Sequence, residues 1–286
     1  MSAEVWEDEE YEYEEDEAWE EDEPDPEAVG GWLPARRSAT REYASLALGL
    51  LAMAPLFLAY EYGLAADASL PRSQSERALF RLFSLAPDVE TLLRRLTLGG
   101  ALLGALVLCY RRRVALGPSL VRVFLEGLVA AVALGPALAY GLRLLGLSAD
   151  TPALATDPTL PTAARVLGAA AFEELLFRVA LYGALYVLSR RLVLFFGVRE
   201  RVSAWVADLI AVAGSALGFA AIHLSSWTGW IGPEGEAFDP GVFTWRLLAG
   251  VLLALLFRWR GPGVAAWSHG LFNLALLVGA DPEVFL

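Results

Sequence analysis

Long apolar segments constrain this chain more than any other feature. They lie at about residues 43–64, 90–110, 119–144, 161–189, 202–224, 241–257 and 262–280. About 20 apolar residues suffice for a helix to cross a bilayer. The sequence therefore predicts an all-α, polytopic transmembrane helix bundle of seven spans, or eight if residues 64–90 add a short or re-entrant one. Membrane lipids would be its permanent surroundings.

The N-terminus has a different composition from the rest of the chain. Its first 27 residues hold 16 of the 34 acidic residues and no basic residue, which leaves 18 acidic and 22 basic residues downstream. Low-complexity acidic sequence with few aliphatic side chains is typical of disorder. We expect residues 1–35 to form a disordered acidic tail and residues 36–286 a transmembrane helical domain. The tail is either a solvated segment without a specific role or a docking segment for a basic protein partner; we expect no nucleic-acid partner.

Arginines predict the orientation of the spans, since basic loops favour the cytoplasmic side. Arginine-containing stretches at 36–41, 111–113, 190–201 and 258–260 fall on one side if all seven segments span, whereas the loops at 148–158 and 227–239 are acidic or neutral. The tail should therefore be cytoplasmic, and we expect a multi-pass protein of a bacterial inner membrane. Residues 64–90 are an exception, because they place Arg72, Arg77 and Arg81 on the opposite side.

A charged heptapeptide, FEELLFR at residues 172–178, interrupts the fourth apolar segment. An ionised side chain at membrane depth costs at least about 2.5–3.5 kcal/mol. Glu174 and Arg178 are spaced i,i+4, so they can pair on one helix face, and we interpret them mainly as a structural ion pair. Glu173 lies about 100° away around the helix and has no partner within the segment. Such a carboxylate suits a general base or acid.

The only two histidines of the chain lie in other apolar segments. His223 follows Phe219 by four residues, and His269 precedes Asn273 by four, so each pair shares one helix face. Interhelical hydrogen bonding would explain either histidine taken singly. Polar groups on three apolar segments are satisfied together if they converge on one intramembrane polar cavity. Because His223 falls near the outer end of its segment and His269 about 10 Å from the inner end of its own, convergence requires tilted, staggered or broken helices.

Other charged residues in the apolar segments have simpler explanations. Glu61, Asp208 and Arg246 lie close enough to segment ends to reach the membrane interface or line the protein interior. We therefore do not expect them to be catalytic, although Glu61 could touch the site.

Three motifs together resemble those of the CPBP family. These are Glu173-Glu174-x-x-x-Arg178, Phe219-x-x-x-His223 and His269-x-x-x-Asn273, in that order, within about residues 161–280. The family comprises CAAX-processing and bacteriocin-processing intramembrane endopeptidases, also called ABI proteins, and includes the Rce1-like CAAX prenyl proteases and the myxosortases. The resemblance implies catalytic roles for Glu173, His223, His269 and Asn273, with Glu174 and Arg178 in support.

Two mechanisms fit this constellation. In the first, Glu173 activates a water held by His223, while His269 and Asn273 donate hydrogen bonds to the developing oxyanion, and no cofactor is required. In the second, Glu173, His223 and His269 bind zinc or another divalent metal that activates the water. We favour the first, because the sequence has no HExxH pair, the commonest zinc signature.

The resemblance indicates a substrate class but no single substrate. We expect cleavage of a peptide bond in a membrane-tethered or exported protein, at a CAAX-like tail, a leader peptide or a C-terminal sorting tag. The alternative is a non-catalytic membrane protein, for binding, transport or immunity, that uses the same polar pocket.

Overall fold

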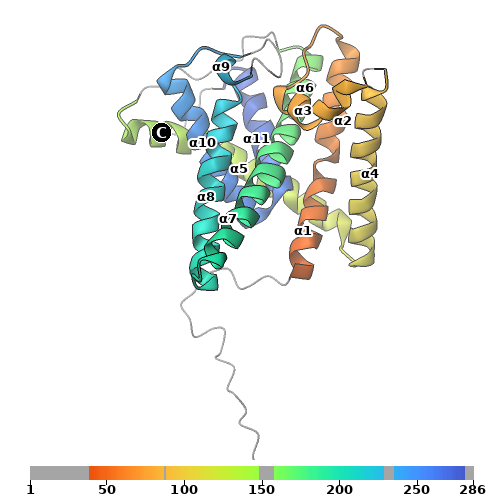
Figure 1. The fold of residues 1–286 in the computed structure, drawn as a ribbon. Coiled ribbons are helices and arrows are strands. Elements are labelled where there is room, and N and C mark those ends of the chain that lie inside the picture. The colour runs from red at the N-terminus through yellow and green to blue at the C-terminus, as the bar shows by residue number, and fades with distance from the viewer. Residues whose placement is uncertain (1–38, 87, 148–157, 229–234, 281–286) are drawn as a thin grey trace, which may run out of the picture. The chain divides into compact units, whose positions relative to one another are not determined.

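The computed structural model describes residues 39–286 except residues 87, 148–157, 229–234 and 281–286. The chain divides into the units Met1–Ser38 and Ala39–Leu286, and the predicted tail lies outside the described residues. Every regular element among the described residues is a helix, and the one isolated bridge there pairs Leu224 with Glu236. The all-α prediction is thereby confirmed (Figure 1).

The helices have the following bounds in chain order: α1 Ala39–Ala52, α2 Ala54–Ala66, α3 Gln74–Leu79, the 3₁₀-helix η1 Arg81–Leu85, α4 Glu90–Arg111, α5 Leu116–Leu144, α6 Leu160–Glu174, the π-helix η2 Leu175–Tyr182, α7 Gly183–Phe195, α8 Glu200–Ala221, α9 Ser225–Thr228, α10 Pro240–Arg260 and α11 Pro262–Leu277. Proline at the start of α2, α6, α10 and α11 agrees with its preference for the first helical turn, where no intrahelical hydrogen bond is lost.

Five helical stretches of the described residues are long and apolar enough to cross a membrane. They are Leu46–Ala66, Glu90–Arg111, Leu116–Leu144, Glu200–Ala221 and Pro240–Arg260. The predicted segments at 161–189 and 262–280 are not among them, because the first changes helix type after its two glutamates and α11 has only 16 residues. The predicted count of seven to eight spans is therefore not confirmed.

Large apolar side chains cover the outer faces of these candidate spans. Leu58, Leu96 and Leu209 are 71%, 61% and 70% exposed. Extensive exposed apolar surface marks contact with a membrane or another protein. With five apolar helices, these faces indicate an integral membrane protein.

Helix α6 packs closely between α2 and α11, and glycines allow this approach. A Cβ atom added at Gly168 of α6 would overlap the Leu56 carbonyl oxygen of α2, and one added at Gly270 of α11 would lie 2.7 Å from the Leu167 carbonyl oxygen. Small residues are the usual means by which membrane helices approach one another. The packing fixes the end of α6, where the two glutamates lie.

The other half of the helical body is built around α8, which packs on α7, α10 and η2. A tight turn then joins α10 to α11 at Gly261, whose φ of 89° favours glycine. The turn places α11 against α10, α5 and α6. The ring of Phe219 on α8 and the ring of His269 on α11 have centroids 5.5 Å apart.

Candidate active site

The two glutamates of the FEELLFR motif are the last residues of α6, and a π-helix follows directly. This π-helix, Leu175–Tyr182, carries the rest of the motif. The wider i→i+5 turns of a π-helix are rare in proteins, and where they occur they often lie at functional sites. The sequence predicts one continuous helix over this segment, so the change in helix type is a finding of the structure.

Glu174 and Arg178 form a fully buried ion pair. The Arg178 Nε atom lies 3.2 Å from Glu174 Oε2, and both side chains are 0% exposed. The pairing has the i,i+4 spacing expected from the sequence. Removing either partner would leave an uncompensated buried charge, which is strongly unfavourable.

His269 lies between the two glutamates. Its Nδ1 is 3.0 Å from Glu174 Oε1, and its Nε2 is 3.5 Å from Glu173 Oε2. An ionised carboxylate can only accept, so with Glu174 ionised Nδ1 carries the proton of that hydrogen bond. The Glu174 interaction therefore fixes the orientation of the ring that faces Glu173.

The ring of Phe219 is the centre around which the site is assembled. His223 and His269 each contact it with ring centroids 5.4 and 5.5 Å apart, and the Arg178 guanidinium carbon lies 5.2 Å from its centroid. A cation over an aromatic face is stabilised by the ring quadrupole. Phe219 thus brings the second motif of the sequence against the first and third.

His223 is oriented by its own helix end. Its Nδ1 is 2.9 Å from the Phe219 carbonyl oxygen, which can only accept, so Nδ1 is the donor. In the neutral ring Nε2 then remains an acceptor. The backbone N–H of Glu236 donates to the His223 carbonyl oxygen at 2.8 Å, which ties the following loop to this position.

Arg246 of α10 adds a positive charge beside these groups. It forms an ion pair of 2.6 Å with Glu236, and its charge acts on both Glu173 and His223. The Arg246 guanidinium lowers the pKa of the Glu236 carboxyl below its ordinary value. The sequence predicts that Arg246 either reaches the membrane interface or lines the protein interior, and its side chain is only 12% exposed. Its partner Glu236 could not be predicted, because contacts between separate segments are not readable from spacing along one helix.

Asn273 is half-buried on α11, one turn beyond His269. Among the described residues, no direct hydrogen bond joins its side chain to Glu173, His223 or His269. The structure therefore links Glu173, Glu174, Arg178, His223 and His269 through contacts and leaves Asn273 beside them. Sharing of one water by Glu173 and His223 stays a prediction.

Within the described ranges, no group of three or more His, Cys, Asp and Glu side chains is arranged to hold a metal ion. We derive no step through a metal, and the metal-free mechanism stays a prediction.

The fold and site define a class of protein: a helical membrane protein with buried and half-buried glutamates and histidines, which are residue types that serve in general acid–base catalysis. Residues 155–275 match the family model described as Type II CAAX prenyl endopeptidase Rce1-like. This region contains all three motifs, and the match supports the CPBP family of CAAX-type proteases. No curated protein and no solved structure matches the chain.

Proposed function

We propose that this protein is an intramembrane endopeptidase in which Glu173 activates the attacking water. The observation that carries the proposal is the position of His269, whose two ring nitrogens face Glu174 and Glu173 inside the region that matches a protease family. A half-buried carboxylate held beside a histidine is suited to general base catalysis.

The proposed reaction uses side chains alone. Glu173 takes a proton from water, and the water oxygen attacks the carbonyl carbon of the scissile bond. His223 Nε2 accepts a hydrogen bond from the second water proton, since Nδ1 is engaged by the Phe219 carbonyl. The carbon–nitrogen bond then breaks, and Glu173 returns its proton to the leaving amine, so one water is consumed per bond.

The oxyanion needs a hydrogen-bond donor in this scheme. The sequence predicts that both His269 and Asn273 donate to it. The contacts of His269 with two glutamates favour a different division, in which His269 orients Glu173 and the side-chain amide of Asn273 donates to the oxyanion.

The family description favours a CAAX-like C-terminal tail as substrate, because it names a CAAX prenyl endopeptidase. A leader peptide and a C-terminal sorting tag, the latter as in the myxosortase branch, are the other two substrates that we propose to test. Comparison of mature protein termini in cells with and without the gene separates the three.

The first prediction is that Glu173→Gln abolishes hydrolysis. Purified protein in detergent is assayed with an internally quenched farnesylated CAAX peptide, and we expect a loss of roughly 100- to 10,000-fold, the usual range for a general base. The matched control is Glu200→Gln, whose side chain is 56% exposed and pairs with Arg190. Equal turnover by wild type and Glu173→Gln would contradict the role of Glu173 as general base, whereas no turnover by the wild type would support the non-catalytic binding alternative.

The second prediction concerns metal removal. Dialysis against a strong zinc chelator should leave the turnover of this peptide unchanged, because the proposed mechanism requires no metal. Loss of turnover that added zinc restores would favour the alternative in which Glu173, His223 and His269 are ligands.

A further inference from the structure

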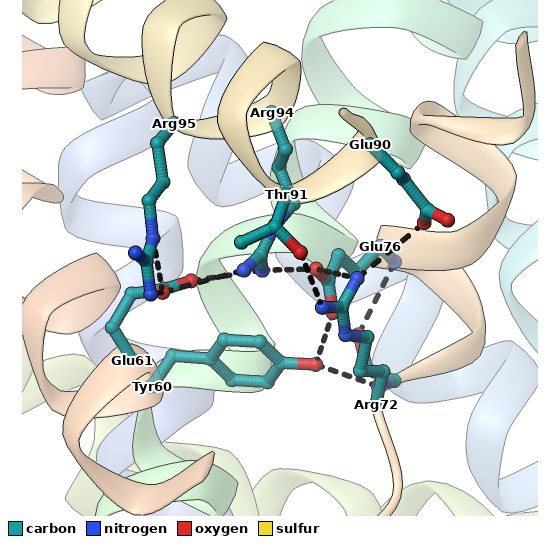
Figure 2. A network of polar contacts seen from close by, with 9 residues as sticks. Tyr60, Glu61, Arg72, Glu76, Glu90, Thr91, Arg94 and Arg95 are labelled. Atoms are coloured by element: carbon teal, nitrogen blue, oxygen red, sulfur yellow. Dashed lines mark hydrogen bonds and ion pairs between the residues drawn. The ribbon is translucent and has the colours of Figure 1, made fainter. Parts of the chain in front are cut away.

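A second buried polar network lies outside the region that matches the family. We call it the Tyr60 network: Tyr60 of α2, Glu76 of α3 and Arg94 of α4 (Figure 2). The Tyr60 hydroxyl donates to Glu76 Oε2 at 2.6 Å, and Arg94 Nη1 donates to Glu76 Oε1. Tyr60, Glu76 and Arg94 are 0%, 1% and 2% exposed. Three helices are thus joined by one buried carboxylate.

Further contacts from neighbouring residues fix the positions of Arg94 and Tyr60. Arg94 Nη1 lies 2.8 Å from Glu61 Oε1, and Arg95 lies 3.3 Å from the same carboxylate (Figure 2). The backbone N–H of Ser73 donates to the Tyr60 hydroxyl at 2.7 Å, so this hydroxyl has a donor and an acceptor. Its position is therefore defined from two directions.

Buried ion pairs are weak evidence for stability, since well-packed apolar residues often replace them without loss. A buried ion pair can instead specify one arrangement of the helices that it joins. This role matters where another contact depends on that arrangement. The contact that depends on it here is made by the ring of Tyr60.

The Tyr60 ring packs against Phe172, with centroids 4.8 Å apart. Phe172 is fully buried and is bonded directly to Glu173. One continuous path therefore runs from Arg94 through Glu76, Tyr60 and Phe172 to the proposed general base.

The helix around Glu173 needs support from such a path. The π-helix begins at Leu175, two residues after Glu173, so regular α-helical hydrogen bonding changes next to the site. His269 restrains the carboxylate on one side. Phe172 restrains the backbone next to Glu173, because its ring packs against Tyr60 of α2.

We propose that Tyr60, held by Glu76 and Arg94, is a positioning residue for Glu173. This inference rests on the proposed function, because it assigns Tyr60 to the geometry of that reaction. A displacement of about 1 Å can cost on the order of 100-fold in rate. Since Phe172 transmits the effect indirectly, we expect about a tenfold loss of kcat in Tyr60→Phe, with KM unchanged.

The chain provides a closely matched control. Tyr182 of η2 also donates a 2.6 Å hydrogen bond to a half-buried carboxylate, at Asp208 Oδ1, but its ring contacts Tyr186 and Phe257. Tyr182→Phe removes the same kind of hydrogen bond, but from a tyrosine whose ring makes no ring contact with Phe172 among the described residues. Both variants should therefore lose similar thermal stability, and only Tyr60→Phe should lose kcat.

The experiment measures kcat, KM and the thermal midpoint of wild type, Tyr60→Phe and Tyr182→Phe with the farnesylated CAAX peptide. If Tyr60→Phe yields no folded protein, Glu76→Gln replaces it, because glutamine keeps an acceptor for Tyr60 and removes the charge paired with Arg94. A selective fall in kcat supports the inference. Equal kcat in Tyr60→Phe and Tyr182→Phe overturns it while leaving the proposed function intact, whereas wild type without Glu173-dependent hydrolysis overturns both.

Discussion

Two buried Glu–Arg pairs in this protein are stabilised in different ways. In the Tyr60 network, both oxygens of Glu76 accept hydrogen bonds, one from Tyr60 and one from Arg94. In the site cluster, formed by Glu174, Arg178 and His269, the Arg178 guanidinium lies over an aromatic ring, and within the described residues none of its nitrogens has a hydrogen-bond partner.

The difference indicates different uses of buried charge. A buried carboxylate whose two oxygens both accept hydrogen bonds, as in Glu76, holds the helices that supply its donors in one arrangement, although Arg94 Nε has no hydrogen-bond partner among the described residues. A buried polar group without its full set of hydrogen bonds requires an explanation, and a reactive site is one of the recognised ones. The Tyr60 network therefore has the properties of a scaffold, and the site cluster has those expected of the active site that we propose.

The largest effect should come from breaking either pair by removing its arginine. Arg178→Ala and Arg94→Ala each leave a buried carboxylate without its nearest arginine, although Arg72 remains 3.9 Å from Glu76. We expect a loss of about 3–5 kcal/mol in stability for both. Folded yield by size exclusion and thermal unfolding in detergent measure this loss. Arg95→Ala is the control, since that side chain is 64% exposed and its ion pair should contribute about 1 kcal/mol or less. Unchanged yield and unfolding in Arg178→Ala would remove the structural role of its ion pair.

A smaller effect on stability should follow when both partners are replaced together. Glu76→Leu with Arg94→Leu, and Glu174→Leu with Arg178→Leu, leave no lone partner of the pair, so each double variant should be more stable than its arginine-to-alanine variant. Their activities should separate the two regions. The first double variant should keep about a tenth of wild-type kcat, as expected for Tyr60→Phe, whereas the second should lose roughly 100-fold or more, because His269 loses the carboxylate that orients it. Equal activities would show that the two regions do not differ in function.

Much of the candidate site could be predicted from local spacing. The i,i+4 relation of Glu174 and Arg178 determines their pairing because neighbours on one helix face meet wherever that helix lies. The two histidines could be singled out because a polar group in an apolar segment needs a partner. The sequence interpretation of Glu61 and Arg246 as segment-end residues was incomplete, since their partners and neighbours come from other helices.

By itself, the sequence determined the helical fold class, the order of the three motifs and the residues that carry them, since apolar length and helical periodicity are local properties. Tertiary structure alone decided that α6 gives way to a π-helix after Glu174, that Phe219 brings the histidines together, and that Tyr60 contacts the residue before Glu173. These features depend on how closely helices approach, as at Gly168, where α2 and α6 leave no space for a side chain. Such distances arise from packing between segments far apart in the chain, so no pattern within one segment encodes them.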